Sequence, residues 1–277
     1  MHVQHLNCGT MCPRPAGLIQ AQGGGVGPAR LVCHCLLIEL KSGWALVDSG
    51  LGTRDIAHAR QRLGGAFLNF VAPTLDVSEC AVTQLGKLGL QASDVRTLLP
   101  THLDLDHAGG ISDFPEATVH LLAREHISAN AREGMLGRER YKPAQWRDAK
   151  FELHEARGER WFGFESVRPL PHSNDEVLII PLPGHTHGHA GIAVRTGKGW
   201  LLHAGDAYFS HQEQLGKRAP LGLEVFQGLL QVDRRQRLHN RARLAELVRA
   251  HGSEVTVFCA HDPHELRALQ ESSRQPA

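Results

Sequence analysis

Short apolar runs recur along the chain, and several of them end in a histidine or an aspartate. Residues 31–40 and 44–47 are two such runs around Lys41-Ser42-Gly43, which predicts two strands joined by a hairpin. Strands that alternate with helices are typical of an α/β protein. The remaining apolar runs predict strands over 95–99, 118–122, 177–182, 190–195, 200–203 and 255–261, and apolar residues at helical spacing predict helices over 78–88, 124–132 and 234–250.

The segment 101–110, Thr-His-Leu-Asp-Leu-Asp-His-Ala-Gly-Gly, directly follows the apolar run 95–99. If the segment is extended, alternation directs every second side chain to one side, with the last histidine beside them at a turn. Two imidazoles and two carboxylates in one loop suit a pair of divalent ions such as zinc. An aspartate that only caps the following helix is the alternative, but capping requires one carboxylate rather than this set. The candidate ligands are His102, Asp104, Asp106 and His107.

Three later apolar runs end in further candidate ligands. Pro-Gly-His-Thr-His-Gly-His at 183–189 provides His185, and the neighbouring His189 is expected to support it. Gly-Asp-Ala at 205–207 provides Asp206, and Ala-His-Asp at 260–262 provides His261. A single zinc ion takes three or four protein ligands, and this chain offers more than that in four clusters. Two metals are therefore predicted.

Composition and charge exclude several classes of protein. Lys and Arg number 30 against 29 Asp and Glu, which leaves no electrostatic footprint for nucleic acid or an anionic membrane. No apolar run reaches the ~20 residues of a membrane span, and the N-terminus lacks the pattern of a secretory signal. The 6 cysteines do not form a disulfide framework, and Cys33 and Cys35 are interpreted as reduced core residues, which suits a cytoplasmic protein. No Gly-x-Ser-x-Gly motif indicates a serine hydrolase.

The order of the motifs resembles the metallo-β-lactamase-fold hydrolases, from His-x-Asp-x-Asp-His at 102–107 to Ala-His-Asp at 260–262. Asp48, in Val47-Asp48-Ser49-Gly50, matches the first motif of that superfamily, an aspartate at a strand end that supports the metal site. The likeness runs from about residue 31 to about 265. It is greatest to acyl-homoserine-lactone lactonases and related esterases, which share the Pro-Gly-His-Thr-x-Gly-His string. The resemblance implies one domain over 1–277 with a four-layer αββα sandwich and the site along one edge of its sheets.

The resemblance also implies roles for single residues. The family usually has a histidine at the position of Asp104, so this carboxylate should make the first metal a weaker Lewis acid and favour manganese or iron there. The lactonases place a tyrosine where this chain has Phe209, so the neighbouring Tyr208 is expected to contact the substrate carbonyl oxygen; the alternative is that Phe209 faces the substrate, as strict alignment with the lactonases implies. Asp106 or Asp206 is expected to pass a proton to the leaving group. One metal would take His102, Asp104 and His185, the other would take Asp106, His107 and His261, and Asp206 would bridge them.

These expectations combine into a hydrolase with two divalent ions per chain, zinc being expected, and a metal-bound hydroxide that attacks a lactone, ester or related carbonyl substrate. Residues 134–164 hold 6 of the 15 Phe, Trp and Tyr side chains. The resemblance implies a cap over the metals at this stretch, where aromatic side chains would form an apolar wall, and an insert packed on its own core is the alternative. The Gly-rich segment 20–29 is expected to be a mobile loop.

The expected partner is a small-molecule substrate with an apolar part, not nucleic acid or a membrane, and a homodimer stays open. Two other functions remain as alternatives. Flavodiiron proteins carry a carboxylate at the position of Asp104, so a diiron-type redox protein is one of them. The other is a phosphoester hydrolase, or a metal-binding protein without catalysis, on the same fold.

Overall fold

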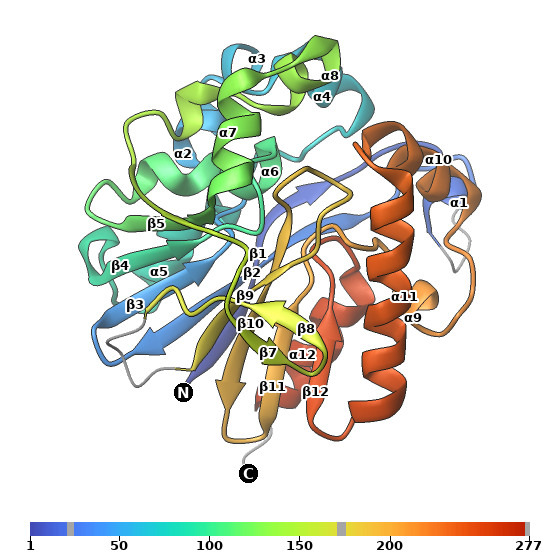
Figure 1. The fold of residues 1–277 in the computed structure, drawn as a ribbon. Helices are drawn as coiled ribbons and strands as arrows, with labels where there is room; N and C mark the ends of the chain where they lie inside the picture. Colours follow the sequence, from blue (N-terminus) through green and yellow to red (C-terminus); the bar gives the residue numbers. More distant parts are fainter. Residues whose placement is uncertain (21–24, 171–175, 275–277) are drawn as a thin grey trace.

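Two β-sheets packed face to face form the centre of the molecule, and helices cover the outer face of each (Figure 1). The computed structural model describes residues 1–20, 25–170 and 176–274. The larger sheet has the order β1 (Val3–Met11), β2 (Leu31–Leu40), β3 (Gly43–Val47), β4 (Val95–Leu99), β5 (Thr118–Leu122) and β6 (Lys150–His154). The smaller sheet has the order β12 (Val255–Phe258), β11 (Gly199–His203), β10 (Ala190–Thr196) and β9 (Val177–Pro181).

The longer helices form the two outer layers, and several short helices lie in the connections between these helices and the strands. The long helix α11 (Arg234–His251) lies against the smaller sheet on the right of Figure 1. On the larger sheet lie α5 (Ala81–Lys87) and α7 (Ala123–Ala131). The other helices are α1 (Ala16–Ile19), α2 (Thr53–Ala57), α3 (Ala59–Arg62), α4 (Gly64–Phe70), α6 (Leu105–Ala108), α8 (Gly134–Arg140), α9 (His211–Gln214), α10 (Leu221–Leu230) and α12 (Pro263–Arg274).

Alternation along β2 explains how one strand serves two cores. Leu36 and Ile38 face the smaller sheet and pack there with residues such as Ile179 and Ile192. Leu37, one position away, faces the opposite side and belongs to the core under α5 and α7. A third core lies between the smaller sheet and α11. Three apolar layers between four layers of structure confirm the predicted αββα sandwich.

Most of the predicted strands and helices are present, with ends shifted by a few residues. The helix predicted over 78–88 is α5, which follows a 3-10 turn at Val77–Glu79. The strand β1 was not predicted, because a register irregularity between Asn7 and Thr10 interrupts its alternation. Part of the Gly-rich segment 20–29, residues 21–24, lies outside the described residues.

The segment 134–164 is built differently from the expected cap. Its strand β6 pairs in parallel with β5 and so extends the larger sheet. The side chains of Tyr141 and Trp146 are buried in the core on the outer face of that sheet. Trp161 and Phe164 lie in the core under α11, on the two-stranded ribbon of β7 (Glu159–Trp161) and β8 (Phe164–Ser166). These aromatic residues fill two existing cores rather than a wall over the candidate ligands.

The ends of several strands meet at one edge of the sandwich. β3 and β4 are parallel, as are β11 and β12, while β9 and β11 share a direction because both are antiparallel to β10. The carboxyl ends of these strands therefore lie at the same edge, where loops can bring side chains together. Within the described ranges, no helix combines the length and apolar character that a membrane crossing requires.

Candidate metal centre

All of the predicted ligands lie at that edge, in loops or turns that follow strand ends. His102 and Asp104 follow β4, and Asp106 and His107 lie in the first turn of α6. The convergence of these four residues thus comes from a loop and a helical turn, not from the extended alternation expected from the sequence. Asp104 occupies the N-cap position of α6, yet its side chain makes no capping hydrogen bond. The alternative that it only caps a helix is therefore wrong.

One group of ligand atoms is formed by His102, Asp104 and His185. Nε2 of His185 lies 3.0 Å from Oδ2 of Asp104, and Nε2 of His102 lies 3.4 Å from the same oxygen. His102 and His185 are fully or almost fully buried. The three side chains come from two loops far apart in sequence, and together they could hold one cation.

A second group lies on the other side of Asp206. Nε2 of His107 and Nε2 of His261 lie 3.2 and 3.1 Å from Oδ1 of Asp206. The other oxygen of this carboxylate, Oδ2, lies 3.3 Å from Nε2 of His185 in the first group. Asp106 completes the second group, with Oδ2 at 3.6 Å from Nε2 of His261. Oδ2 of Asp206 also lies 3.3 Å from Nε2 of His261, so the carboxylate of Asp206 stands between the two groups and contacts both, as a bridging ligand would.

The unpaired atoms in this cluster fit bound cations. In the part of the chain that the structure describes, Nε2 of His102 and Oδ1 of Asp206 are buried without a hydrogen-bond partner. Nε2 of His107 and Nε2 of His261 also face each other at 3.3 Å. A buried polar atom without a partner costs about 1–3 kcal/mol, so such atoms are rarely left in this state unless something binds them. Nitrogen and carboxylate donors suit divalent metals.

Hydrogen bonds behind the cluster orient the imidazole rings. Nδ1 of His261 donates to the backbone oxygen of Val32 at 2.8 Å, which leaves Nε2 unprotonated in the neutral ring. Nδ1 of His107 lies 2.8 Å from Oδ2 of Asp48, as expected for the supporting aspartate. His189 donates from Nδ1 to Leu182 and accepts the backbone N–H of Asp206 at Nε2. Both nitrogens of His189 are occupied, so it supports the cluster without being a ligand.

A buried carboxylate ties the two ligand loops together. Glu125 of α7 accepts the backbone N–H of Leu103 at 3.1 Å with Oε1. Its Oε2 accepts the hydroxyl of Thr186 at 2.6 Å and the backbone N–H of Gly188 at 3.1 Å. Glu125 is 0% exposed, so these bonds are not exchanged with water. The positions of His102 and His185 therefore depend on a residue that is not itself in the cluster.

Arg140 is the partner of the unusual carboxylate of Asp104, and no sequence pattern points to this contact. Its Nε lies 2.9 Å from Oδ1 of Asp104, and its other nitrogens donate to the backbone oxygens of His185 and Leu230. Burial alone would raise the pKa of Asp104, but the charges of Arg140 and His102 hold it well below its usual value. Arg140 lies at the end of α8, in the segment that had been interpreted as a cap.

The charges of the cluster also place a proton where a cation could bind. Burial would lower the pKa of His107, but Asp206 and Asp48 raise it well above its usual value. Burial would raise the pKa of Asp206, but His261 and His107 lower it well below its usual value. Without a cation the cluster thus favours a protonated imidazole next to an ionised carboxylate. Metal binding has to displace that proton, so the affinity for metal should decrease as the pH is lowered.

Of the two adjacent aromatic residues Tyr208 and Phe209, the alternative one, Phe209, lies next to the candidate ligands. The hydroxyl of Tyr208 is buried and donates to Oε1 of Glu265 at 2.9 Å, away from the ligand atoms. The ring of Phe209 lies next to the cluster, with its centroid 4.9 Å from that of His261 and 6.1 Å from that of His185. The role expected for Tyr208 does not agree with this placement, and an apolar ring takes its place.

Cys33 also lies at the second group, although the sequence suggested only a core residue. One ligand atom from each of Cys33, Asp106 and His261 lies within 4.8 Å of the others. The signal was hidden because Cys33 stands in an uninterrupted apolar run, where a cysteine is ordinarily part of the core.

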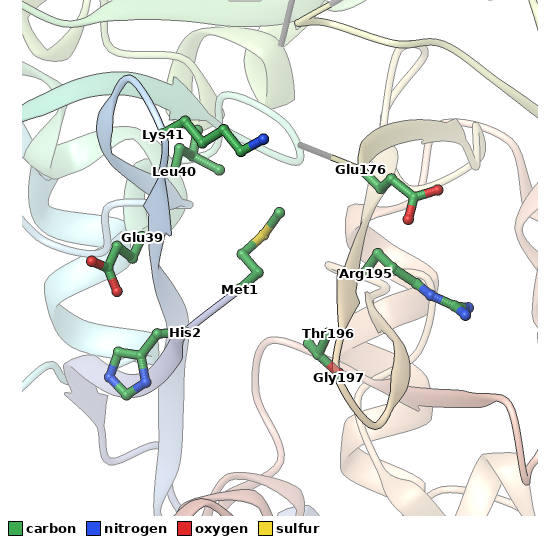
Figure 2. A pocket seen from close by; sticks show the side chains of 9 residues that line it. All are labelled: Met1, His2, Glu39, Leu40, Lys41, Glu176, Arg195, Thr196 and Gly197. Atoms are coloured by element: carbon green, nitrogen blue, oxygen red, sulfur yellow. The ribbon is translucent and has the colours of Figure 1, made fainter. Parts of the chain in front are cut away.

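A cavity of about 590 Å³ lies at the opposite ends of the strands (Figure 2). Glu39, Leu40 and Lys41 of the β2–β3 hairpin line one side, and Arg195 and Thr196 line the other, with Met1 between them. None of the candidate ligands lines it. It therefore belongs to a different part of the molecule from the candidate metal centre.

Comparison with known proteins agrees with this geometry. The sequence model of the metallo-beta-lactamase superfamily matches residues 28–261. A probable metallo-hydrolase of Mycobacterium tuberculosis is 40% identical over 263 residues, which cover 94% of this chain and 80% of that protein. An N-acyl homoserine lactonase of Bacillus cereus is 26% identical over 169 residues, which cover 61% of this chain and 60% of that one.

A solved structure shares the fold at lower identity. It is an AiiA variant from B. thuringiensis with N-decanoyl-L-homoserine bound at the active site. The TM-score is 0.71 at 20% identity, with 96% of this chain and 95% of that chain covered. The superfamily match spans most of the sequence, and the mycobacterial relative matches nearly all of it. The chain therefore belongs to the metallo-beta-lactamase superfamily and is a metal-dependent hydrolase.

Proposed function

We propose that this chain uses two divalent ions to hydrolyse a lactone or ester of a small molecule with an apolar part. The observation that carries the proposal is the carboxylate of Asp206, which presents Oδ2 to His185 at 3.3 Å and Oδ1 to His107 and His261 at 3.2 and 3.1 Å. A carboxylate that lies between two ligand groups and contacts both is suited to bridge two metals.

The ligand groups assign the residues that would hold each ion. When bound, the two ions, zinc in the simplest case, would activate a water molecule and polarise the substrate oxygen. One ion would be held by His102, Asp104 and His185, the other by Asp106, His107 and His261, with Asp206 between them.

The protein side chains supply positioning and proton transfer. Asp106 is the most exposed carboxylate of the cluster, with 13% of its side chain accessible against 4% for Asp206. It is therefore the better placed of the two to pass a proton to a leaving group. The ring of Phe209, 2% exposed, packs with Leu223 and Phe226 and makes the environment beside the imidazoles apolar. Apolar surroundings of this kind suit a substrate with an acyl or aryl group.

The lactone part of the proposal is supported by what relatives are named for. The relative from Bacillus cereus is an N-acyl homoserine lactonase, and the AiiA structure holds N-decanoyl-L-homoserine. Names of this kind do not favour a diiron redox protein.

Elemental analysis and a substrate panel test the proposal together. Protein reconstituted with zinc should contain two ions per chain, and Asp206→Ala should lose affinity for both. The panel should contain acyl-homoserine lactones of different tail length, simple lactones, aryl esters and a phosphodiester. We expect turnover of lactones or esters that rises with the apolar tail. One ion per fully loaded chain would contradict the two-metal site, and turnover of the phosphodiester alone would contradict the substrate class.

A further inference from the structure

A buried thiol lies beside the second ligand group. Cys33 is 2% exposed, and its sulfur lies within 4.8 Å of a carboxylate oxygen of Asp106 and a ring nitrogen of His261. No hydrogen bond of this thiol is found within residues 1–20, 25–170 and 176–274. The side chain is therefore not held in place by another polar partner.

The backbone around Cys33 fixes this arrangement from both sides. The N–H of Cys33 donates to Oδ1 of Asn7 at 3.1 Å. On its other edge, the N–H of His34 donates to the backbone oxygen of Ala260 at 2.9 Å. The carbonyl of Val32 accepts Nδ1 of His261, so the ring of His261 is bound to the strand one residue before the thiol. The short separation of Cys33 and His261 thus follows from hydrogen bonds between the backbone of β2 and the loop after β12 rather than from a flexible side chain.

A second, independent observation at the same place points to a bound cation. Oδ1 of Asp206 is buried without a hydrogen-bond partner among the described residues, and it faces Nε2 of His261 at 3.1 Å. This unpaired oxygen also lies 3.2 Å from Nε2 of His107, and His261, which it faces, lies within 4.8 Å of the Cys33 sulfur. Thiolate sulfur together with imidazole and carboxylate is a common donor set for zinc.

We propose that Cys33 is a further protein ligand of the cation held by Asp106, His107 and His261. This inference rests on the proposed two-metal function. On binding, the thiol loses its proton to the buffer and its sulfur binds the cation, so no oxidant or reductant is required. The two positions then differ in chemistry, because the first has the additional hard oxygen of Asp104 and the second has a soft sulfur. The second position should therefore select zinc or cobalt more strongly than manganese.

Cobalt binding makes the sulfur visible. We would remove metal from the full-length protein with a chelator under anaerobic, reducing conditions, and then titrate it with Co²⁺. A cobalt–thiolate bond gives a strong charge-transfer band in the near ultraviolet, which nitrogen and oxygen ligands do not give. We expect one thiolate equivalent of this band per chain, and its loss in Cys33→Ala. Cys35→Ala is the matched control, because this buried thiol stands two positions along the same strand and should leave the band unchanged.

X-ray absorption of the wild-type zinc protein supplies a test that needs no variant. A sulfur neighbour at about 2.3 Å from zinc, at one sulfur per two zinc ions, is the expected result. Two Co²⁺ per chain with no charge-transfer band and no sulfur neighbour would overturn the role of Cys33 and leave the two-metal site intact. Persistence of the band in Cys33→Ala would also overturn it. Fewer than two Co²⁺ per chain would instead refute the two-metal function.

Discussion

Replacing Asp104 by histidine, the residue usual in the family, tests whether this carboxylate and Arg140 form one unit. The Nε of Arg140 lies 2.9 Å from Oδ1 of Asp104, and only 3% and 11% of the two side chains are exposed. In Asp104→His the guanidinium stays buried and loses its counter-charge. Removing one partner of a buried ion pair costs about 3–5 kcal/mol. Asp104→His, although it restores the ligand common in the family, should therefore destabilise the fold.

Urea unfolding of the chelator-treated protein measures this effect without the contribution of bound metal. We expect the free energy of unfolding of Asp104→His to fall by about 3–5 kcal/mol, a change of roughly a hundredfold or more in the folding equilibrium. The double variant Asp104→His/Arg140→Met removes the stranded charge, so it should recover most of the loss. A double-mutant cycle with Arg140→Met then gives the coupling between the two residues.

An exposed ion pair provides the control. Arg96 and Glu116 lie 2.7 Å apart with more than half of each side chain exposed, so Glu116→His should cost no more than about 1 kcal/mol. If Asp104→His is as stable as the wild type, Arg140 is held mainly by its bonds to the backbone oxygens of His185 and Leu230. A double variant no more stable than Asp104→His would refute the argument in the same way.

Three further predictions concern residues around the cluster. Because the Tyr208 hydroxyl donates to Glu265, Tyr208→Phe should leave kcat unchanged and lower the free energy of unfolding by about 1 kcal/mol, as measured by steady-state kinetics and urea unfolding. A large loss of kcat would contradict the placement of this hydroxyl away from the candidate ligands. Burial raises the pKa of Glu265 from 4.5 to about 8, so this carboxyl stabilises the fold below pH 4.5 and loses that effect as the pH rises toward 8. The urea midpoint should therefore fall between these pH values, and Glu265→Gln should flatten that fall. An unchanged pH dependence of the midpoint in this variant would contradict the prediction. Glu125→Ala should leave donors of Leu103 and Thr186 unpaired and weaken metal binding at least tenfold, as measured by competition with a chelating dye. Unchanged affinity for metal would show that the two ligand loops keep their positions without Glu125.

The gathering of the candidate ligands could be predicted because its signal is local. Each candidate follows the end of an apolar run, and strand ends of both sheets meet at one edge of the sandwich. The orientation of neighbouring side chains carried no such signal. Tyr208 and Phe209 are adjacent, and only the buried Glu265, far along the chain, decides which of them turns away from the cluster. An offset of one residue along the chain therefore decides which of the two aromatic side chains lies next to the candidate ligands.

The cap predicted for the segment 134–164 differs from the structure for a related reason. Its aromatic residues stand among charged ones, a pattern that does not say whether they cover a site or enter a core. In the structure Tyr141 is buried in the core over the larger sheet, while Trp161 is buried in the core under α11. The only side chain of this segment that the structure places at the candidate ligands is Arg140, among the residues described. Its contact with Asp104 depends on the packing of α8, which no local pattern records.

That contact changes what the carboxylate at position 104 means for the metals. Taken alone, Asp104 adds a negative charge where the family usually has a neutral imidazole, and it should weaken the first cation as a Lewis acid. Arg140 brings a compensating positive charge to within 2.9 Å, and it stays charged at any pH at which the protein folds. The pair as a whole is as neutral as histidine, but it presents oxygen rather than nitrogen to the cation. The substitution therefore alters the hardness of the ligand while the net charge of the site stays the same, which is the difference that selects between metals.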